Sequence, residues 1–176
     1  MAVERSDGLV GQWVLLSYRL PREPSTPRIT LWRRLRRLGV VQLGDGLVAL
    51  PADARTLEQL EWVAEEAVQA GGTAGVWLAR PGSRAQEQAI AAALAEARAV
   101  EYAGLATAAA DALALSPQAR LRSLTRLRRQ WREITRRDFF PPAQREQAAA
   151  ALRVLTEAAS VLEADGAGGA VPAVRP

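Results

Sequence analysis

The chain has 176 residues, with 23 basic and 19 acidic side chains and a formal net charge of +4 at pH 7. It contains neither cysteine nor histidine, which excludes disulfides, thiolate catalysis, histidine-based triads and almost every zinc site. Carboxylates, hydroxyls and arginine are the catalytic groups that remain, so we expect no enzymatic activity, no metal and no cofactor.

The length indicates one domain, or one domain with a helical appendage. No apolar run approaches the roughly 18 to 20 residues that a membrane span needs. The N-terminus also lacks the continuous apolar region of a secretory signal. We therefore expect a cytoplasmic protein without a membrane partner.

Arginine supplies every basic residue, and its distribution along the chain is uneven. Residues 27–40 carry five arginines and no acid, and residues 116–137 carry eight arginines against Glu133 alone. The rest of the chain is therefore net acidic. Arginine without lysine, in an alanine-rich chain, is typical of a GC-rich genome, but segregated basic patches also favour a polyanionic partner.

The apolar pattern between residues 12 and 80 predicts six elements separated by glycine and proline. Their order is strand, helix, strand, strand, helix, strand, which is that of a ferredoxin-like unit. Such a unit has a four-stranded antiparallel sheet with both helices on one face, and its open face needs a cover from the chain or a second subunit. The predicted elements are a strand over 13–20, an arginine-rich helix that ends at Gly39, strands over 40–43 and 47–50, a helix over 56–70 and a strand over 73–79.

From residue 83 onward every signal is helical. Helical sequence runs from 84 to about 115, and a leucine seam over 117–137 is repeated over 143–163 after the Phe139-Phe140-Pro141-Pro142 turn. Two seams joined by a short turn predict an antiparallel helical hairpin. The fold class is therefore α+β. The expected domains are a flexible arm over 1–11, a ferredoxin-like domain over 12–80, a helical extension over 83–163 and a disordered tail over 164–176.

Three stretches resemble a known family in order and spacing. They are TPRITLWRRLRRLGVVQLGDGLVALP at 26–51, LEWVAEEAVQAGG at 60–72 and LRRQWREITRRDFFPP at 127–142. Together they resemble the N-terminal domain of ChrB, the chromate-resistance regulatory protein, over roughly residues 12–162. A more distant similarity runs to the PaaX family of phenylacetate-pathway repressors.

The resemblance implies a cytoplasmic regulator that senses chromate and controls expression of a chromate-efflux transporter. Full-length ChrB proteins carry a further C-terminal domain, to which the response to chromate is usually attributed, and the sequence ends before it. We therefore expect a separate sensor domain or a narrower role for a stand-alone version. PaaX-like repressors also carry an N-terminal winged helix, for which there is no room before Trp13, so a DNA-reading element is not carried over.

The first candidate site is the basic face of the helix that ends at Gly39. Guanidinium groups on this face suit DNA phosphates or a tetrahedral oxyanion such as chromate. The alternative is a solvated face whose arginines pair with the acids of the 56–70 helix. The candidate residues are Arg33, Arg34, Arg36 and Arg37.

The second candidate site lies on the 117–137 helix, opposite its leucine seam. Binding of the DNA backbone by these residues predicts an affinity that falls steeply with salt. The alternative is surface charge paired with acids of the last helix, namely Glu146, Glu157 and Glu163. The candidate residues are Arg122, Arg126, Arg129 and Arg136.

Aromatic and acidic residues suggest two further functions that the sequence does not favour. Five tryptophans could stack on single-stranded nucleic acid, but each falls on or beside a core stripe, so we expect all five in the core and leave only Tyr18 open. Small CRISPR-associated nucleases of ferredoxin-like fold need an aspartate after strand one, where this chain has Ser17-Tyr18-Arg19. Asp45 and Asp53 are explained by turn chemistry. The tryptophans are Trp13, Trp32, Trp62, Trp77 and Trp131.

Two functions therefore remain. The chain is either a DNA-associated regulator that represses a chromate-efflux transporter gene, or an arginine-based sensor of chromate or sulfate that acts through a protein partner without binding DNA. Chromate is the candidate effector in both. A homodimer that pairs open sheet edges is expected and is compatible with the first function.

Overall fold

The computed structural model describes residues 11–167, with side chains up to residue 160. The chain divides into two compact units, Met1–Leu94 and Ala95–Pro176, and this division falls within helix α3 (Arg84–Ala112). Each unit is described by itself. The predicted α+β class, with a four-stranded antiparallel sheet followed by helices, is confirmed.

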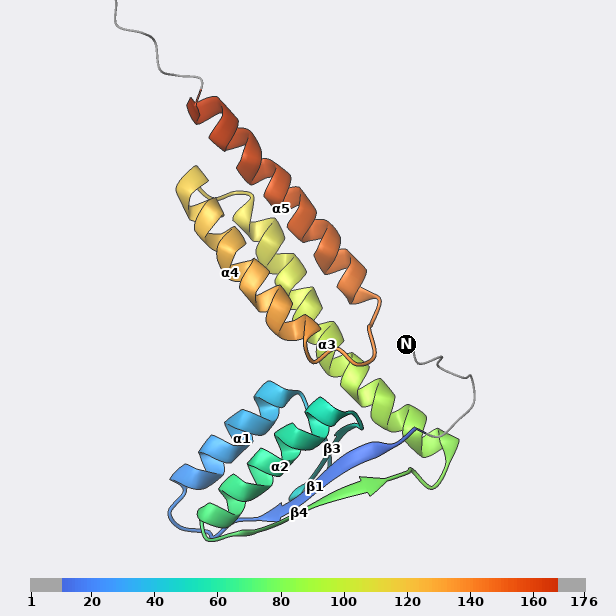
Figure 1. The fold of residues 1–176 in the computed structure, drawn as a ribbon. Helices are drawn as coiled ribbons and strands as arrows, with labels where there is room; N and C mark the ends of the chain where they lie inside the picture. Colours follow the sequence, from blue (N-terminus) through green and yellow to red (C-terminus); the bar gives the residue numbers. More distant parts are fainter. Residues whose placement is uncertain (1–10, 168–176) are drawn as a thin grey trace, which may run out of the picture. The chain divides into compact units, whose positions relative to one another are not determined.

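The first unit has the strand order of the expected ferredoxin-like unit. The sheet is β2-β3-β1-β4 with antiparallel neighbours throughout, and both helices α1 and α2 lie on one of its faces (Figure 1). The two edges are therefore β2 and β4, while β1 is central. The elements are β1 (Trp13–Arg19), α1 (Thr26–Leu38), β2 (Val41–Gly44), β3 (Leu47–Pro51), α2 (Ala54–Gln69) and β4 (Thr73–Ala79).

The core of the first unit lies between the sheet and helix α2. Val14 and Leu16 of β1 alternate with residues of the other face, and both are fully buried. Leu60 and Val63 of α2 are likewise fully buried. Alternation along β1 and the spacing of three along α2 thus place apolar side chains on facing surfaces.

The second face of the sheet is partly covered by the first turns of α3. The Glu87 carboxylate accepts hydrogen bonds from the Gly11 amide and, at 3.4 Å, from the Trp13 indole N–H. Ile90 borders a small hollow with Leu15 of β1. The chain itself therefore supplies part of the cover that an open sheet face was expected to need.

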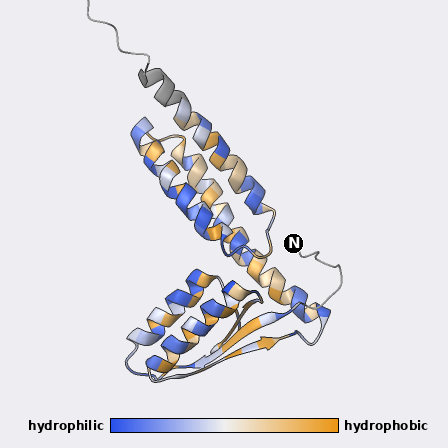
Figure 2. Ribbon diagram, in the orientation of Figure 1, coloured by the Kyte–Doolittle hydropathy of each residue, from blue (hydrophilic) through white to orange (hydrophobic). Residues whose placement is uncertain are grey.

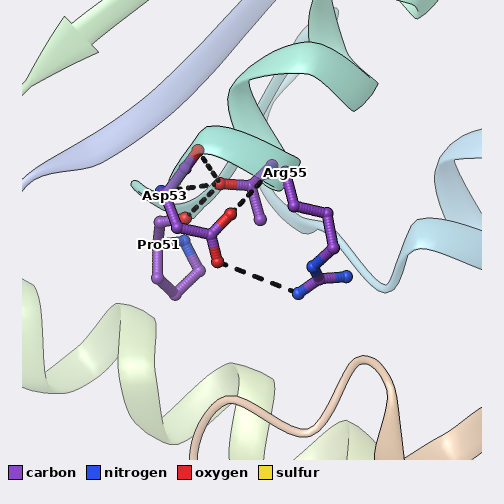
Figure 3. A network of polar contacts seen from close by, with 4 residues as sticks. Pro51, Asp53 and Arg55 are labelled. Atoms are coloured by element: carbon purple, nitrogen blue, oxygen red, sulfur yellow. Dashed lines mark hydrogen bonds and ion pairs between the residues drawn. The ribbon is translucent and has the colours of Figure 1, made fainter. Parts of the chain in front are cut away.

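Helix α2 begins with a capping box that the sequence analysis treated as turn chemistry. The Asp53 carboxylate accepts a 2.6 Å bond from the Thr56 amide, and the Thr56 hydroxyl accepts a 2.9 Å bond from the Asp53 amide (Figure 3). The same hydroxyl donates to the carbonyl of Pro51 at 2.7 Å. These bonds satisfy amides that a helix start otherwise leaves unpaired, so Asp53 has a structural role.

The turn between β2 and β3 is held against β1 at Gly46. The Tyr18 amide donates to the Gly46 carbonyl at 2.7 Å. Gly46 has a φ of 69°, and a Cβ atom there would lie 2.2 Å from the Tyr18 carbonyl oxygen. Only glycine fits both the left-handed backbone and the close approach.

The second unit is a bundle of three helices. The second half of α3 packs with α4 (Pro117–Thr135) and α5 (Gln144–Ala167) around a shared core. The expected hairpin of the last two helices is therefore completed by a third helix. Of the predicted seams, Leu124, Leu127, Ile134 and Leu155 are buried, Leu121, Trp131 and Leu152 are partly buried, and Leu162 lies outside the residues whose side chains are described.

A buried polar cluster lies where α3 meets the α4–α5 connection. The Tyr102 hydroxyl donates to the Asp138 carboxylate at 2.9 Å, and Arg145 lies 3.5 Å from the same oxygen. The Asp138 side chain has no exposed surface. Glu101 forms ion pairs of 2.8 Å with Arg98 and 3.0 Å with Arg137. A charge buried to this degree is tolerated only with such partners, so the cluster fixes the connection to α3.

The remaining structural expectations concern the chain ends and membrane spans. The predicted arm and tail lie outside the described residues, except that Gly11 is described and α5 reaches Ala167. Within the described part of the chain, no helix is both long and apolar enough to cross a membrane.

Replacing Gly46 by alanine is expected to destabilise the first unit. The added Cβ meets the Tyr18 carbonyl and forces strained backbone, which costs about 1–3 kcal/mol of unfolding free energy. Gly44→Ala is the matched control, because nothing lies within 4 Å of its Cβ position. Urea unfolding measures both, and equal stability of the two variants would show that the Gly46 contact is unimportant.

Stability is expected to fall at alkaline pH through the two tyrosines of the chain. Burial raises the pKa of both Tyr18 and Tyr102, and for Tyr102 the bond to Asp138 adds to the effect. Unfolded tyrosine titrates near pH ~10, so each contribution is present below that pH and is lost as pH rises through the folded pKa. Tyr102→Phe should reduce the drop in unfolding free energy measured by urea titration. An unchanged pH dependence would contradict this assignment.

Candidate nucleic-acid interface

Helix α1 divides into a buried stripe and a basic surface. Leu31 and Leu35, one turn apart, are its buried residues. The helix begins with Pro27 in its first turn and ends at Gly39, whose φ of 75° lets its amide donate to the carbonyls of Leu35 and Arg36. The two leucines anchor the helix and turn its arginines outward, and α1 is mostly hydrophilic in Figure 2.

The four predicted arginines of α1 differ in their partners. Arg34 is half-buried and forms an ion pair with Glu66 of α2, so the alternative of pairing with the acidic helix holds for this residue. Arg33, Arg36 and Arg37 are exposed, and none forms an ion pair with a carboxylate of residues 11–160. Three of the four are thus available to an external anion.

Trp32 does not lie where the sequence predicted it. Like the other tryptophans it was expected in the core, but it is 50% exposed. The guanidinium of Arg36 lies over the ring, 4.9 Å from its centroid. An aromatic ring and a cation at positions i and i+4 of one helix face each other, and this spacing is the signal that could have placed Trp32 among the arginines.

Two surface hollows border Trp32. One is lined by Thr30, Trp32, Arg33, Arg36 and Arg37 of α1 alone. The other brings Trp32 and Arg28 together with the end of β1 and the β2–β3 turn, and its further residues are Tyr18, Arg19, Leu20, Asp45 and Gly46. The tryptophan therefore belongs to a concave surface with arginines on both sides. We call Trp32 and the lining residues of these two hollows the Trp32 surface.

Of the four predicted arginines, Arg122, Arg126 and Arg129 share one face of α4, and Arg136 follows the helix as its C-cap. Leu124, Leu127 and Ile134 bury the opposite side, and α4 is predominantly hydrophilic in Figure 2. Only Arg129 has a nearby acid, Glu133, at 3.9 Å. Among the residues with described side chains, the expected alternative partners Glu146 and Glu157 of α5 form no such pair, and the side chain of Glu163 lies outside them. Arg122, Arg126, Arg129 and Arg136 are all exposed.

Three tryptophans were wrongly expected in the core. Besides Trp32, Trp62 on α2 is 56% exposed and Trp77 on β4 is 60% exposed. The Trp77 indole donates to the Ser17 hydroxyl at 3.1 Å. Trp13 is 3% exposed and lies in the core as expected. Trp131 is partly buried and packs against the core, with its ring 5.2 Å from that of Tyr102.

Comparisons with known proteins give one family. Residues 28–114 match the family model described as Protein ChrB, N-terminal. No curated protein and no solved structure gives a significant match. The matched segment begins in α1 and ends after α3, so it contains the α1 arginines but not α4, and it is shorter than the expected 12–162. Over residues 28–114 the chain is therefore similar to the ChrB N-terminal family.

Proposed function

We propose that the chain is a regulator of the chromate-resistance type that binds DNA through the exposed arginines of α1 and α4. The observation that carries the proposal is the set of unpaired, exposed guanidinium groups on α1, inside the segment that matches the ChrB N-terminal family. A matching exposed set on α4 supports it. Regulation by repression of a chromate-efflux transporter gene is the role we assign, without catalysis.

Electrostatics favours phosphate as the group that these arginines bind. Arg33 and Arg37 have no carboxylate partner to displace among the described residues, so each can replace a condensed counterion of DNA without first breaking an ion pair. Each phosphate neutralised releases a counterion, and log affinity then falls with log salt by about 0.9 per contact. Contacts of this kind position a protein on DNA and carry no sequence information.

A second candidate function is favoured by the α1 hollow. Three arginines and Thr30 are among its lining residues, and guanidinium groups suit a tetrahedral oxyanion. In this alternative the chain senses chromate or sulfate and acts through a protein partner. If the protein does not shift DNA and calorimetry detects heat of binding with chromate or sulfate, the alternative is favoured over DNA binding.

Loss of one exposed arginine is expected to weaken binding to the duplex upstream of the chain's own gene. Arg33→Ala and Arg126→Ala should each reduce the slope of log affinity against log salt by about 1. Arg153→Ala is the matched control, because Arg153 is exposed on α5 and lies outside both arginine sets. Fluorescence anisotropy over a salt series measures the slopes.

Two results would contradict the proposal. If the unmodified protein does not retard the duplex at low salt, DNA binding is excluded. If Arg153→Ala lowers the slope as much as the other two variants, the binding is a general effect of charge and not of the two arginine sets.

A homodimer remains a prediction that rests on the free edges of the sheet. Strand β4 is an edge and exposes Trp77 and Leu78, and unpaired edges can pair with a second copy. Light scattering of the protein and of Trp77→Arg tests this. We expect a dimer for the unsubstituted protein and a weaker dimer for Trp77→Arg.

A further inference from the structure

We propose that the Trp32 surface binds an unpaired nucleotide, with the base stacked on the Trp32 ring and its phosphates held by the surrounding arginines. This inference rests on the proposed function, because it adds a contact with a base to the phosphate contacts proposed for the α1 site. It concerns residues 18–46 of the first unit only.

Trp32 is not needed to anchor α1, and its only aromatic or cationic contact among the described residues is with Arg36. Leu31 and Leu35 already bury the inner side of α1, and half of the Trp32 side chain remains in contact with solvent. A partner that covers the apolar face of an exposed aromatic ring removes apolar surface from water, which stabilises the complex. Trp32 is therefore placed to bury its ring against a ligand.

The groups around the ring select a ligand with both an aromatic face and negative charge. Arg33, Arg36 and Arg37 line one hollow beside Trp32, and Arg19 and Arg28 line the other. Among the described residues none of the five pairs with a carboxylate. A nucleotide supplies a base for the ring and a phosphate for the arginines of the first hollow.

The second hollow adds polar groups that could contact a base edge. Asp45 and Tyr18 line it together with Trp32. Asp45 is an acceptor for exocyclic amino groups, and it would repel a small anion placed near it. This acid at the border favours a nucleotide over an inorganic oxyanion as the occupant of the whole surface.

An unpaired nucleotide fits better than a paired one for a geometric reason. Bases inside a duplex are covered on both faces by their neighbours, whereas a base in a single strand or loop presents a free face for stacking. Arg36 lies over the Trp32 ring, so a base stacked on the ring would extend an existing cation–aromatic stack. Duplex phosphates would still reach the arginines but would not cover the ring.

The experiment compares a labelled single strand with the duplex of the same sequence by fluorescence anisotropy. Removing the ring in Trp32→Ala should weaken binding of the single strand by about five- to hundredfold, which corresponds to the loss of one aromatic stack. Trp32→Phe should retain most of the affinity, and duplex binding should change by less than about twofold in both variants. Trp62→Ala is the matched control, because Trp62 is equally exposed but lies among the acids of α2.

The outcomes separate this inference from the proposed function. If the single strand binds but Trp32→Ala and Trp62→Ala bind it equally, the Trp32 site is overturned while DNA binding stands. If Trp32→Ala weakens duplex and single strand alike, recognition of an unpaired base is overturned. If neither nucleic acid binds, the proposed function and the inference both fail. Quenching of tryptophan fluorescence by inorganic sulfate alone, lost in Trp32→Phe, would assign the surface to oxyanions and overturn the inference.

Discussion

The basic surface of the first unit depends on the way in which α1 is anchored. Two buried leucines hold the helix, and an ion pair between Arg34 and Glu66 ties its flank to α2. Burial of a leucine side chain contributes roughly 1.5–3 kcal/mol, whereas a half-exposed ion pair contributes about 1 kcal/mol or less. Burial of the two leucines therefore contributes most of the anchoring of α1. This anchoring does not depend on the other arginines or on Trp32.

The second unit is also held together by residues other than its exposed arginines. A leucine stripe buries one side of α4, and the cluster of Tyr102, Asp138 and Arg145 fixes the connection to α5. The exposed arginines of α4 take no part in either arrangement. Both units thus present a basic helix face that their own cores do not require, and this shared property is the basis of the proposed nucleic-acid binding.

Much of the fold could be predicted because it follows from apolar periodicity. Alternation along β1 and the repeated seams on α4 and α5 bury apolar side chains, and the glycine turn at 44–46 separates two paired strands. Trp32 could not be placed this way, because its size suggests burial while a cation four residues later stabilises it at the surface. The predicted 84–115 helix was not expected to complete a bundle with the hairpin, because α3 is alanine-rich and buries Tyr102, Leu105, Ala109 and Ala112 rather than a leucine seam.

The central claim is that the exposed arginines of α1 bind nucleic acid. The side-chain Nε–H resonances of arginine, followed by NMR during titration with DNA, report each guanidinium separately. We predict that the resonances of Arg33, Arg36 and Arg37 shift on binding, while that of Arg153 on α5 does not. Binding that leaves all three α1 resonances unmoved would contradict the account.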